Sequence, residues 1–115
     1  MAITIYGIKN CDTMKKAMQW LDTHGVDYHF HDYRKQGVPA TALQHWIDTL
    51  GWETVINRRG TTWRKLEQSG RDNMDAASAL EQAQANPSLI KRPILDTGAT
   101  VRAGFDDTEW TSLLI

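Results

Sequence analysis

The hydrophobic pattern at the start of the chain changes from that of a strand to that of a helix and back, which strongly limits how the chain can fold. Residues 3–6 form a β-branched and aromatic run typical of a strand, which Gly7 is expected to break. Apolar residues recur at helical spacing over residues 14–21, and Gly25 is expected to end this helix. Apolar and polar side chains then alternate over residues 26–31, as in a second strand. These patterns predict a βαβ unit with parallel strands and a right-handed crossover.

The end of the chain predicts two more strands and a last helix. The segment "RPILD" is a brief strand, "TGAT" a hairpin turn and "TVRAGF" an antiparallel partner strand. The tail, residues 106–114, predicts a helix with Asp106 or Asp107 as its N-cap. Its inward-facing side chains are expected to be Trp110, Leu113 and Leu114.

A βαβ unit, a helical stretch and a ββα unit together predict an α/β chain with a thioredoxin-like fold, a mixed four-stranded sheet and a helical insertion. We expect the thioredoxin-like parts to cover about residues 1–35 and 90–115, and the insertion about residues 39–90. With 115 residues and no internal repeat or linker, the chain is expected to form a single domain.

Helices are expected within the insertion. Thr41 and Gln44 fit a capping box at the start of a helix that Gly51 ends. Residues 56–66, "INRRGTTWRKL", are basic and turn-like, with a short helix near Trp63.

A further helix is expected to begin at Asp72 or Asn73 and to end before Pro87. The apolar face of this helix is thin. The residues expected on that face are Ala76, Ala77, Leu80 and Ala83.

The composition excludes several classes of protein. The formal net charge is −1, from 13 basic and 14 acidic side chains, so we expect no general affinity for nucleic acid or membrane. No apolar run approaches the roughly 20 residues that span a bilayer, and the N-terminal segment lacks the features of a signal peptide. One cysteine cannot form an internal disulfide, so we expect a cytoplasmic setting. We expect a monomer, because no spare apolar face stands out.

That cysteine, Cys11, lies between the first strand and the first helix. Free N–H groups at the helix start, the helix dipole and the nearby Lys9, Lys15 and Lys16 all favour the thiolate, so the pKa should fall below about 8.5. Asp12 acts in the opposite direction. The alternative is a thiol that only packs beneath the helix, and the polar neighbours of the cysteine argue against it.

The spacing around Cys11 excludes an internal dithiol mechanism. The position three residues after it, where C-x-x-C oxidoreductases carry a second cysteine, is Met14. Any mixed disulfide on Cys11 must therefore be resolved by an outside thiol. In a reducing compartment the natural supplier is glutathione or a glutaredoxin-like partner.

Three segments, "IYGIKNCDTMKKAMQWLDTHGVDYHFHDYRKQGVP", "NRRGTTWRKL" and "IKRPIL", resemble the ArsC/Spx family, and most closely its YffB-type branch. The resemblance spans essentially the whole chain. It implies a thioredoxin-like fold with a helical insertion, and it implies that Cys11 is the reactive thiol.

The resemblance also implies anion-binding residues. In arsenate reductases of this family three arginines bind the oxyanion and the glutathionylated intermediate, and the first two match Arg59, with Arg58 as the alternative, and Arg92. Pro93 is expected to follow a cis peptide bond. Guanidinium groups also suit the two carboxylates of glutathione. Glutathione is thus expected as a co-substrate, with no bound cofactor.

This chain departs from the arsenate reductase pattern at two places. The third arginine should fall near Gly104 or Phe105, whereas the chain has Arg102. Lys15 stands where those enzymes have an arginine four residues after the cysteine, and lysine lacks the bidentate fork that suits an oxyanion. Both departures count against arsenate reduction.

Three functions follow from these features. The first is a glutathione-dependent thiol oxidoreductase in which Cys11 is the nucleophile, and Arg59, Arg92, Lys9, Lys15 and Pro93 bind the glutathione adduct. The second is a glutathione- or glutaredoxin-coupled arsenate reductase. The third is a non-enzymatic regulator of the Spx type that binds RNA polymerase.

Two other features have simpler interpretations. His29 and His31 lie two residues apart on a predicted strand without a third ligand, so we expect no metal site. The five tryptophans fall mostly on or beside apolar helical faces, without an interleaved basic stripe, so we expect them in the core rather than stacked on bases.

Overall fold

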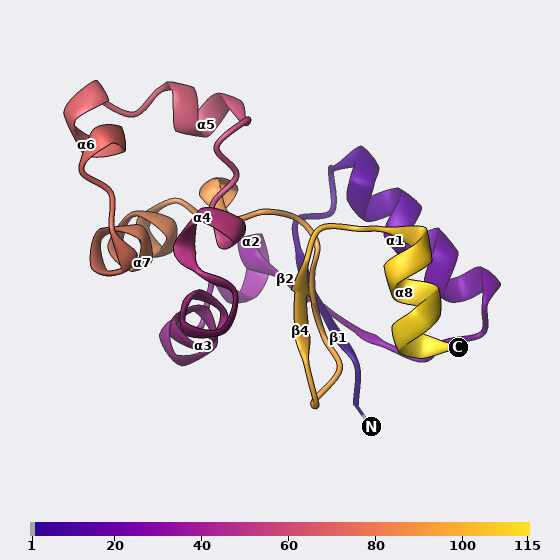
Figure 1. Cartoon of the computed structure of the whole chain (residues 1–115). Coiled ribbons are helices and arrows are strands. Elements are labelled where there is room, and N and C mark those ends of the chain that lie inside the picture. The colour runs from indigo at the N-terminus through magenta and orange to yellow at the C-terminus, as the bar shows by residue number, and fades with distance from the viewer. Residues whose placement is uncertain (1) are drawn as a thin grey trace. The chain divides into compact units, whose positions relative to one another are not determined.

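The predicted βαβ unit is present in the computed structural model of the chain, which describes residues 2–115 (Figure 1). β1 and β2 are parallel and are joined through α1. The elements in chain order are β1 (Thr4–Gly7), α1 (Asp12–Thr23), β2 (His29–Asp32), α2 (Tyr33–Gln36), α3 (Ala40–Leu50), α4 (Trp52–Val55), α5 (Thr61–Arg64), α6 (Gln68–Asp72), α7 (Ala76–Ala85), the 3₁₀ helix η1 (Pro87–Leu89), β3 (Ile94–Asp96), β4 (Val101–Ala103) and α8 (Asp107–Leu114).

The sheet is mixed, with the strand order β2-β1-β3-β4. β3 pairs antiparallel with β1 and with β4, and Ile94 lies opposite both Tyr6 and Ala103. The predicted βαβ unit, ββα unit and mixed four-stranded sheet of a thioredoxin-like fold are thereby confirmed. Asp106 accepts from the N–H of Glu109 and caps α8, as one of the two predicted alternatives.

The contacts divide the chain into two units, which we describe separately. The sheet unit comprises residues 2–36 and 92–115, and the helical unit comprises residues 37–91. Within the residues described, no helix combines the length and the apolar character that a membrane span requires.

The core of the sheet unit lies on one face of the sheet, beneath α1 and α8, which lie side by side in Figure 1. Trp20 and Trp110 meet edge to face there, with ring centroids 5.8 Å apart. Trp20 also donates from Nε1 to Asp107 Oδ1 at 3.0 Å, which joins the two helices across 87 positions of sequence. The buried residues of this core are Ile5, Met14, Ala17, Trp20, Leu21, Leu95 and Trp110.

Gly7 does not break the first strand, contrary to the prediction. It is the last residue of β1 and pairs with Asp32. A Cβ at this position would lie 2.6 Å from Sδ of the buried Met14, so the glycine allows α1 to pack closely against the strand. β2 in turn begins at His29, three residues after the start of the predicted alternation.

In the helical unit α3 packs against α7, and both predicted N-caps need correction. Pro39, not Thr41, is the N-cap of α3, and proline at this boundary already fixes the backbone in an extended conformation. Asp75, rather than Asp72 or Asn73, caps α7 and forms a reciprocal capping box with Ser78.

The later start of α7 also changes its buried face. Ala76 and Ala77 are exposed, Leu80 is half-buried, and Ala79 and Ala83 are buried. The short helix near Trp63 is confirmed as α5, whereas α2, α4 and α6 were not predicted. Each of those three has only four or five residues, which is too short for a hydrophobic period to show.

Candidate active site

Cys11 lies where β1 has ended and α1 begins. It is the N-cap residue of α1, with an extended backbone (φ −148°, ψ 127°), and its carbonyl accepts from the N–H of Lys15 at 3.0 Å. The side chain is half-buried and packs against the edge of the core. The thiol thus touches apolar residues, yet it stays open to reagents at the carboxyl end of a strand, where ligands of α/β sheets commonly bind.

The environment of Cys11 favours its thiolate. Burial by itself raises the pKa of the thiol, but the N–H of Met14, the hydrogen bond and charge of Arg92 and the N–H of Thr13 together lower the pKa below its ordinary value. The side chain forms no N-cap hydrogen bond, although the N–H groups of Thr13 and Met14 both favour its charged form. The predicted direction of the shift is therefore the direction found, and Arg92 is part of its cause.

Arg92 reaches the thiol from the segment that leads into β3. The Arg92–Pro93 peptide bond is cis, as the resemblance implied. The carbonyl of Pro93 accepts from the N–H of Gly104 at 2.7 Å, and Gly104 adopts a positive φ of 87° just after β4. The neighbouring strand therefore anchors this segment, and the structure brings together Cys11, Arg92 and Pro93.

Lys9 and Lys15 are exposed on either side of Cys11 in the chain. Neither is among the groups named as causes of the lowered pKa of Cys11, so their contribution to that shift stays a prediction. Flexible, hydrated ammonium groups at the surface contribute little through solvent. Their role in binding an anionic group attached to the sulfur stays a prediction.

An aromatic cluster that was not predicted also lies in the sheet unit. The rings of Tyr6 and Tyr33 stack at 6.5 Å, and His31 lies 4.9 Å from the ring of Tyr6. Tyr33 is 3% exposed and its hydroxyl is buried without a hydrogen bond. Burial and Tyr6 raise the pKa of Tyr33, whereas the nearby Arg92 lowers it, so Tyr33 stays neutral beside the arginine that faces Cys11.

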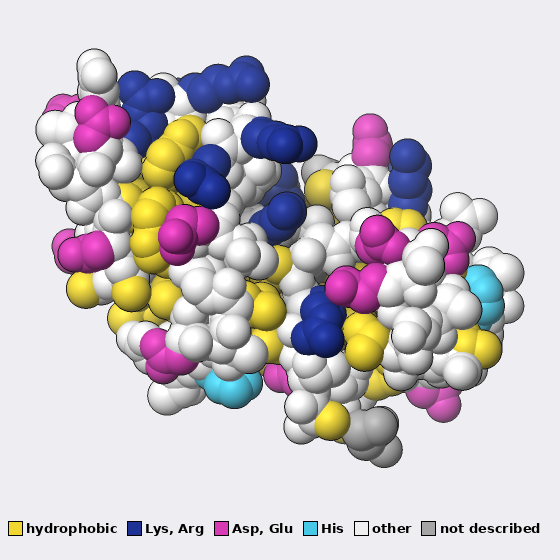
Figure 2. All heavy atoms as spheres, viewed as in Figure 1, with side chains coloured by type: hydrophobic (Ala, Val, Ile, Leu, Met, Phe, Trp, Pro, Cys, Tyr) yellow, Lys and Arg dark blue, Asp and Glu magenta, His cyan; other side chains and the backbone are white. Residues whose placement is uncertain are grey.

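Arg59 belongs to the helical unit, where it lines a pocket of about 310 Å³ together with Arg58 and Lys91. The N–H of Arg59 donates to Asn57 Oδ1 at 3.2 Å, and the guanidinium of Arg58 lies 5.7 Å from the centre of the Trp52 ring. Figure 2 shows lysine and arginine side chains gathered over α4 and α5. Both alternatives for the first arginine thus lie in one basic pocket, and which of them binds an anion stays a prediction.

Arg102 is engaged in other interactions. Its guanidinium donates to Thr100 Oγ1 and to the carbonyl of Val101, and it forms an ion pair with Glu109 at 3.5 Å. Its position on β4, opposite Leu95, directs it toward the face that carries α8. This arrangement gives Arg102 a structural role.

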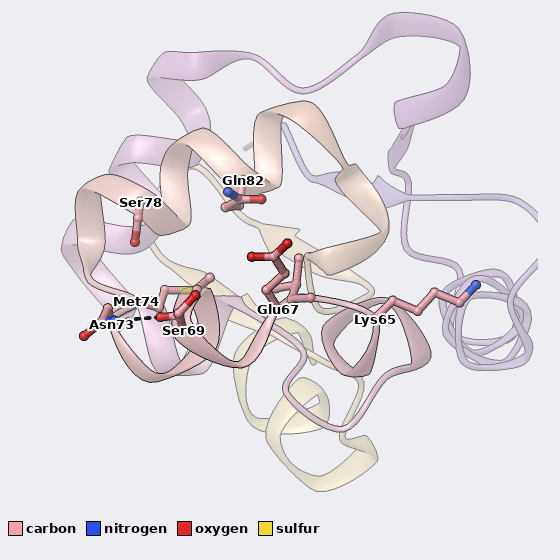
Figure 3. A pocket seen from close by; sticks show the side chains of 9 residues that line it. Lys65, Glu67, Ser69, Asn73, Met74, Ser78 and Gln82 are labelled. Atoms are coloured by element: carbon pink, nitrogen blue, oxygen red, sulfur yellow. Dashed lines mark hydrogen bonds between the residues drawn. The ribbon is translucent and has the colours of Figure 1, made fainter.

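A separate pocket of about 490 Å³ lies wholly within the helical unit (Figure 3). Asn73 donates to the carbonyl of Ser69 at its rim, and Ser78 and Gln82 reach it from α7. It contains no cysteine or histidine, and Lys65 supplies its only cationic side chain. The residues that line the pocket therefore include no thiol for redox chemistry and no imidazole to activate a serine. Among residues 2–115, no three histidine, cysteine, aspartate or glutamate side chains are grouped to hold a metal.

Comparison with known proteins places these features in a family. The model of the ArsC family matches residues 6–113. The solved structure of a YffB protein is 46% identical, covers 99% of this chain and 100% of its own, and superposes with a TM-score of 0.96. The solution structure of an arsenate reductase (ArsC) related protein from Brucella melitensis is 51% identical, covers 97% of this chain and 93% of its own, and has a TM-score of 0.80.

Two curated relatives extend the comparison. An uncharacterized protein of Haemophilus influenzae is 42% identical over 94% of this chain and 95% of its own length. The global transcriptional regulator Spx 1 of Lactococcus lactis is 27% identical over 97% of this chain and 88% of its own length.

Proposed function

This chain belongs to the ArsC family, and from that premise we propose that it is a thiol oxidoreductase that uses Cys11 as its single nucleophile and glutathione as its co-substrate. The observation that carries the proposal is the position of the half-buried Cys11 thiol at the N-terminus of α1 beside Arg92, which helps to lower its pKa. A thiolate is the nucleophile in thiol–disulfide exchange, so this environment favours the reaction.

The reaction proceeds through two exchanges. The Cys11 thiolate attacks the glutathione sulfur of a mixed disulfide, the disulfide bond of the substrate breaks, and the substrate leaves as a thiolate. A second glutathione thiolate then attacks the glutathione sulfur of the adduct, which releases glutathione disulfide and regenerates the Cys11 thiolate. An outside thiol is required because the chain has no second cysteine.

Several charged groups suit the glutathione adduct. Arg92 lies beside the sulfur, and Lys9 and Lys15 flank it in the chain. We propose that Arg59 binds one of the glutathione carboxylates, because guanidinium groups form charge-assisted bidentate contacts with carboxylates. The cytoplasm, where glutathione is abundant, is the proposed compartment.

The test is the intact mass of the protein after treatment with glutathione disulfide. We expect the mass of one glutathionyl group on the wild type, its removal by reduced glutathione or glutaredoxin, and no adduct on Cys11→Ser. A wild type that gains no mass would overturn the proposal. Arg59→Ala and Arg58→Ala, compared in the same assay, identify the arginine that binds the adduct.

Arsenate reduction is a second candidate, favoured by the likeness to an arsenate reductase related protein. Here Cys11 would attack arsenate, and glutathione would resolve the product. The engagement of Arg102 by Glu109 and the lysine at position 15 count against it. Arsenite formation with glutathione and glutaredoxin, lost in Cys11→Ser, would establish this activity.

Binding to RNA polymerase is a third candidate, which rests on the likeness to a transcriptional regulator of the Spx class. Met14 removes the C-x-x-C switch, so such binding would not respond to disulfide closure. Co-purification of polymerase with wild type and Cys11→Ser alike would support this role. No recovery of polymerase from either protein would exclude it.

A further inference from the structure

We propose that a pocket beside the thiol loop binds the γ-glutamyl end of glutathione while its sulfur is joined to Cys11. This inference rests on the proposed function, since it assigns the part of the co-substrate that the site recognises. We call it the Lys35 pocket. It has a volume of about 360 Å³ and is lined by Lys9, Met18, His29, Phe30, Asp32, Lys35 and Gln36, all in the sheet unit.

The sheet brings this pocket to the thiol loop. β1 and β2 are parallel and Gly7 pairs with Asp32, so both strands end at the same edge of the sheet. The loop that carries Lys9 and Cys11 leaves β1 there, and α2, with Lys35, leaves β2 there. Residues from both connections therefore line one pocket.

The charges of the pocket mirror those of the ligand. Glutathione has two carboxylates and one ammonium group, and the pocket has the ammonium groups of Lys9 and Lys35 and the carboxylate of Asp32. The γ-glutamyl end carries a carboxylate and the ammonium group on one carbon. In our assignment the carboxylate binds between the two lysines, and the ammonium group binds Asp32.

Asp32 is built to hold a fixed orientation. It is 9% exposed, and its Oδ1 accepts from the N–H of Arg34 at 2.9 Å. This bond orients the carboxylate and directs its remaining acceptor capacity to the pocket that it lines. A largely buried carboxylate in the lining of a pocket is a specific partner for an ammonium group, because little water competes for it.

Size and reach also agree with this ligand. The volume lies within the range for small-molecule sites, and Met18 and Phe30 offer apolar surface to the methylene groups of the γ-glutamyl chain. Lys9 precedes Cys11 by two residues, which span at most about 7 Å of chain. The γ-glutamyl residue is joined to the cysteine that carries the sulfur, so its charged end lies roughly two residue lengths, about 7 Å, from the sulfur and can reach the pocket.

The test compares disulfides with and without the γ-glutamyl group. Adduct formation is timed by intact mass with the disulfides of glutathione, of γ-glutamylcysteine and of cysteinylglycine. We expect Lys35→Gln to slow the reaction of the first two about fivefold and to leave that of cysteinylglycine disulfide unchanged. Lys35→Glu should slow the first two further.

Arg34→Gln is the matched control, since it removes a neighbouring exposed charge that does not line the pocket. We expect it to react at the wild-type rate. Equal slowing by Lys35→Gln and Arg34→Gln, equal slowing with all three disulfides, or no slowing by either Lys35 variant would overturn the pocket assignment and leave the proposed function intact. A wild type that forms no adduct with any disulfide would overturn the proposed function itself.

Discussion

Arg92 hydrogen-bonds the sulfur of Cys11 from the position directly before a cis proline. The two residues lie 81 positions apart in the sequence, at the start of α1 and before β3. Because β1 and β3 pair antiparallel, the chain after β1 and the chain before β3 meet at one edge of the sheet. The pairing of the strands therefore places a fixed positive charge beside the nucleophile.

The first prediction concerns the pKa of Cys11. Arg92→Ala should move the pKa upward, since it removes a hydrogen bond and a positive charge that lower it. The pH dependence of alkylation by iodoacetamide measures this shift directly, because Cys11 is the only cysteine. Arg34→Ala, which removes an exposed charge elsewhere in the sheet unit, should keep the wild-type profile. An unchanged midpoint in Arg92→Ala would show that the guanidinium does not stabilise the thiolate.

The second prediction concerns stability as a function of pH. A thiol whose pKa is lower in the folded state binds fewer protons there than in the unfolded chain, so its contribution is fully present above the unfolded pKa of about 8.5. This contribution is lost as the pH falls through the lowered folded pKa. The free energy of unfolding of the wild type, minus that of Cys11→Ser, should therefore rise with pH across this window. Urea titrations of both proteins at a series of pH values measure this difference in unfolding free energy. A difference that stays constant or falls with pH would contradict the lowered pKa.

The longer helices could be predicted because each one is long enough for its apolar residues to repeat at helical spacing. The four inward positions of α1 fall at helical spacing, and the strands on either side are short runs between turn residues. The caps of α3 and α7 were misplaced by two or three residues, since a polar residue that could serve as a cap lies close to each true boundary and the sequence alone does not select between them.

Only some residues of the candidate site could be predicted from the sequence. Cys11 stands out in the sequence as a lone thiol at a helix start, and the resemblance to a family points to Arg92. Asp32 and Lys35 were missed because they meet Lys9 only through the pairing of β1 with β2, and Tyr33 was missed because only the fold brings it near Arg92. The sequence did contain an indication of them. Asp32 and Lys35 follow the second predicted strand, and the ends of two parallel strands lie at the same edge of a sheet.

The third prediction tests why Gly7 lies inside β1. Gly7→Ala should lower the free energy of unfolding by about 1–3 kcal/mol, because the new Cβ would lie 2.6 Å from Sδ and 2.9 Å from Cε of the fully buried Met14. Gly70→Ala is the matched control. Gly70 lies in α6 with nothing within 4 Å of the added carbon, so alanine there should stabilise by about 0.5–1 kcal/mol. Urea unfolding measures both, and equal effects would show that the contact with Met14 does not limit this position.

The fourth prediction tests whether α8 is part of the core. Trp110 is fully buried, and its ring meets Phe105 edge to face at 4.8 Å as well as Trp20. Trp110→Ala should lower the free energy of unfolding by about 3–5 kcal/mol, since it removes a large apolar surface and leaves a cavity between α8 and α1. Ile115→Ala, at a side chain that is 68% exposed five residues later, should change stability by no more than about 0.5 kcal/mol. If both variants unfold at the same urea concentration as the wild type, α8 does not hold the sheet unit together.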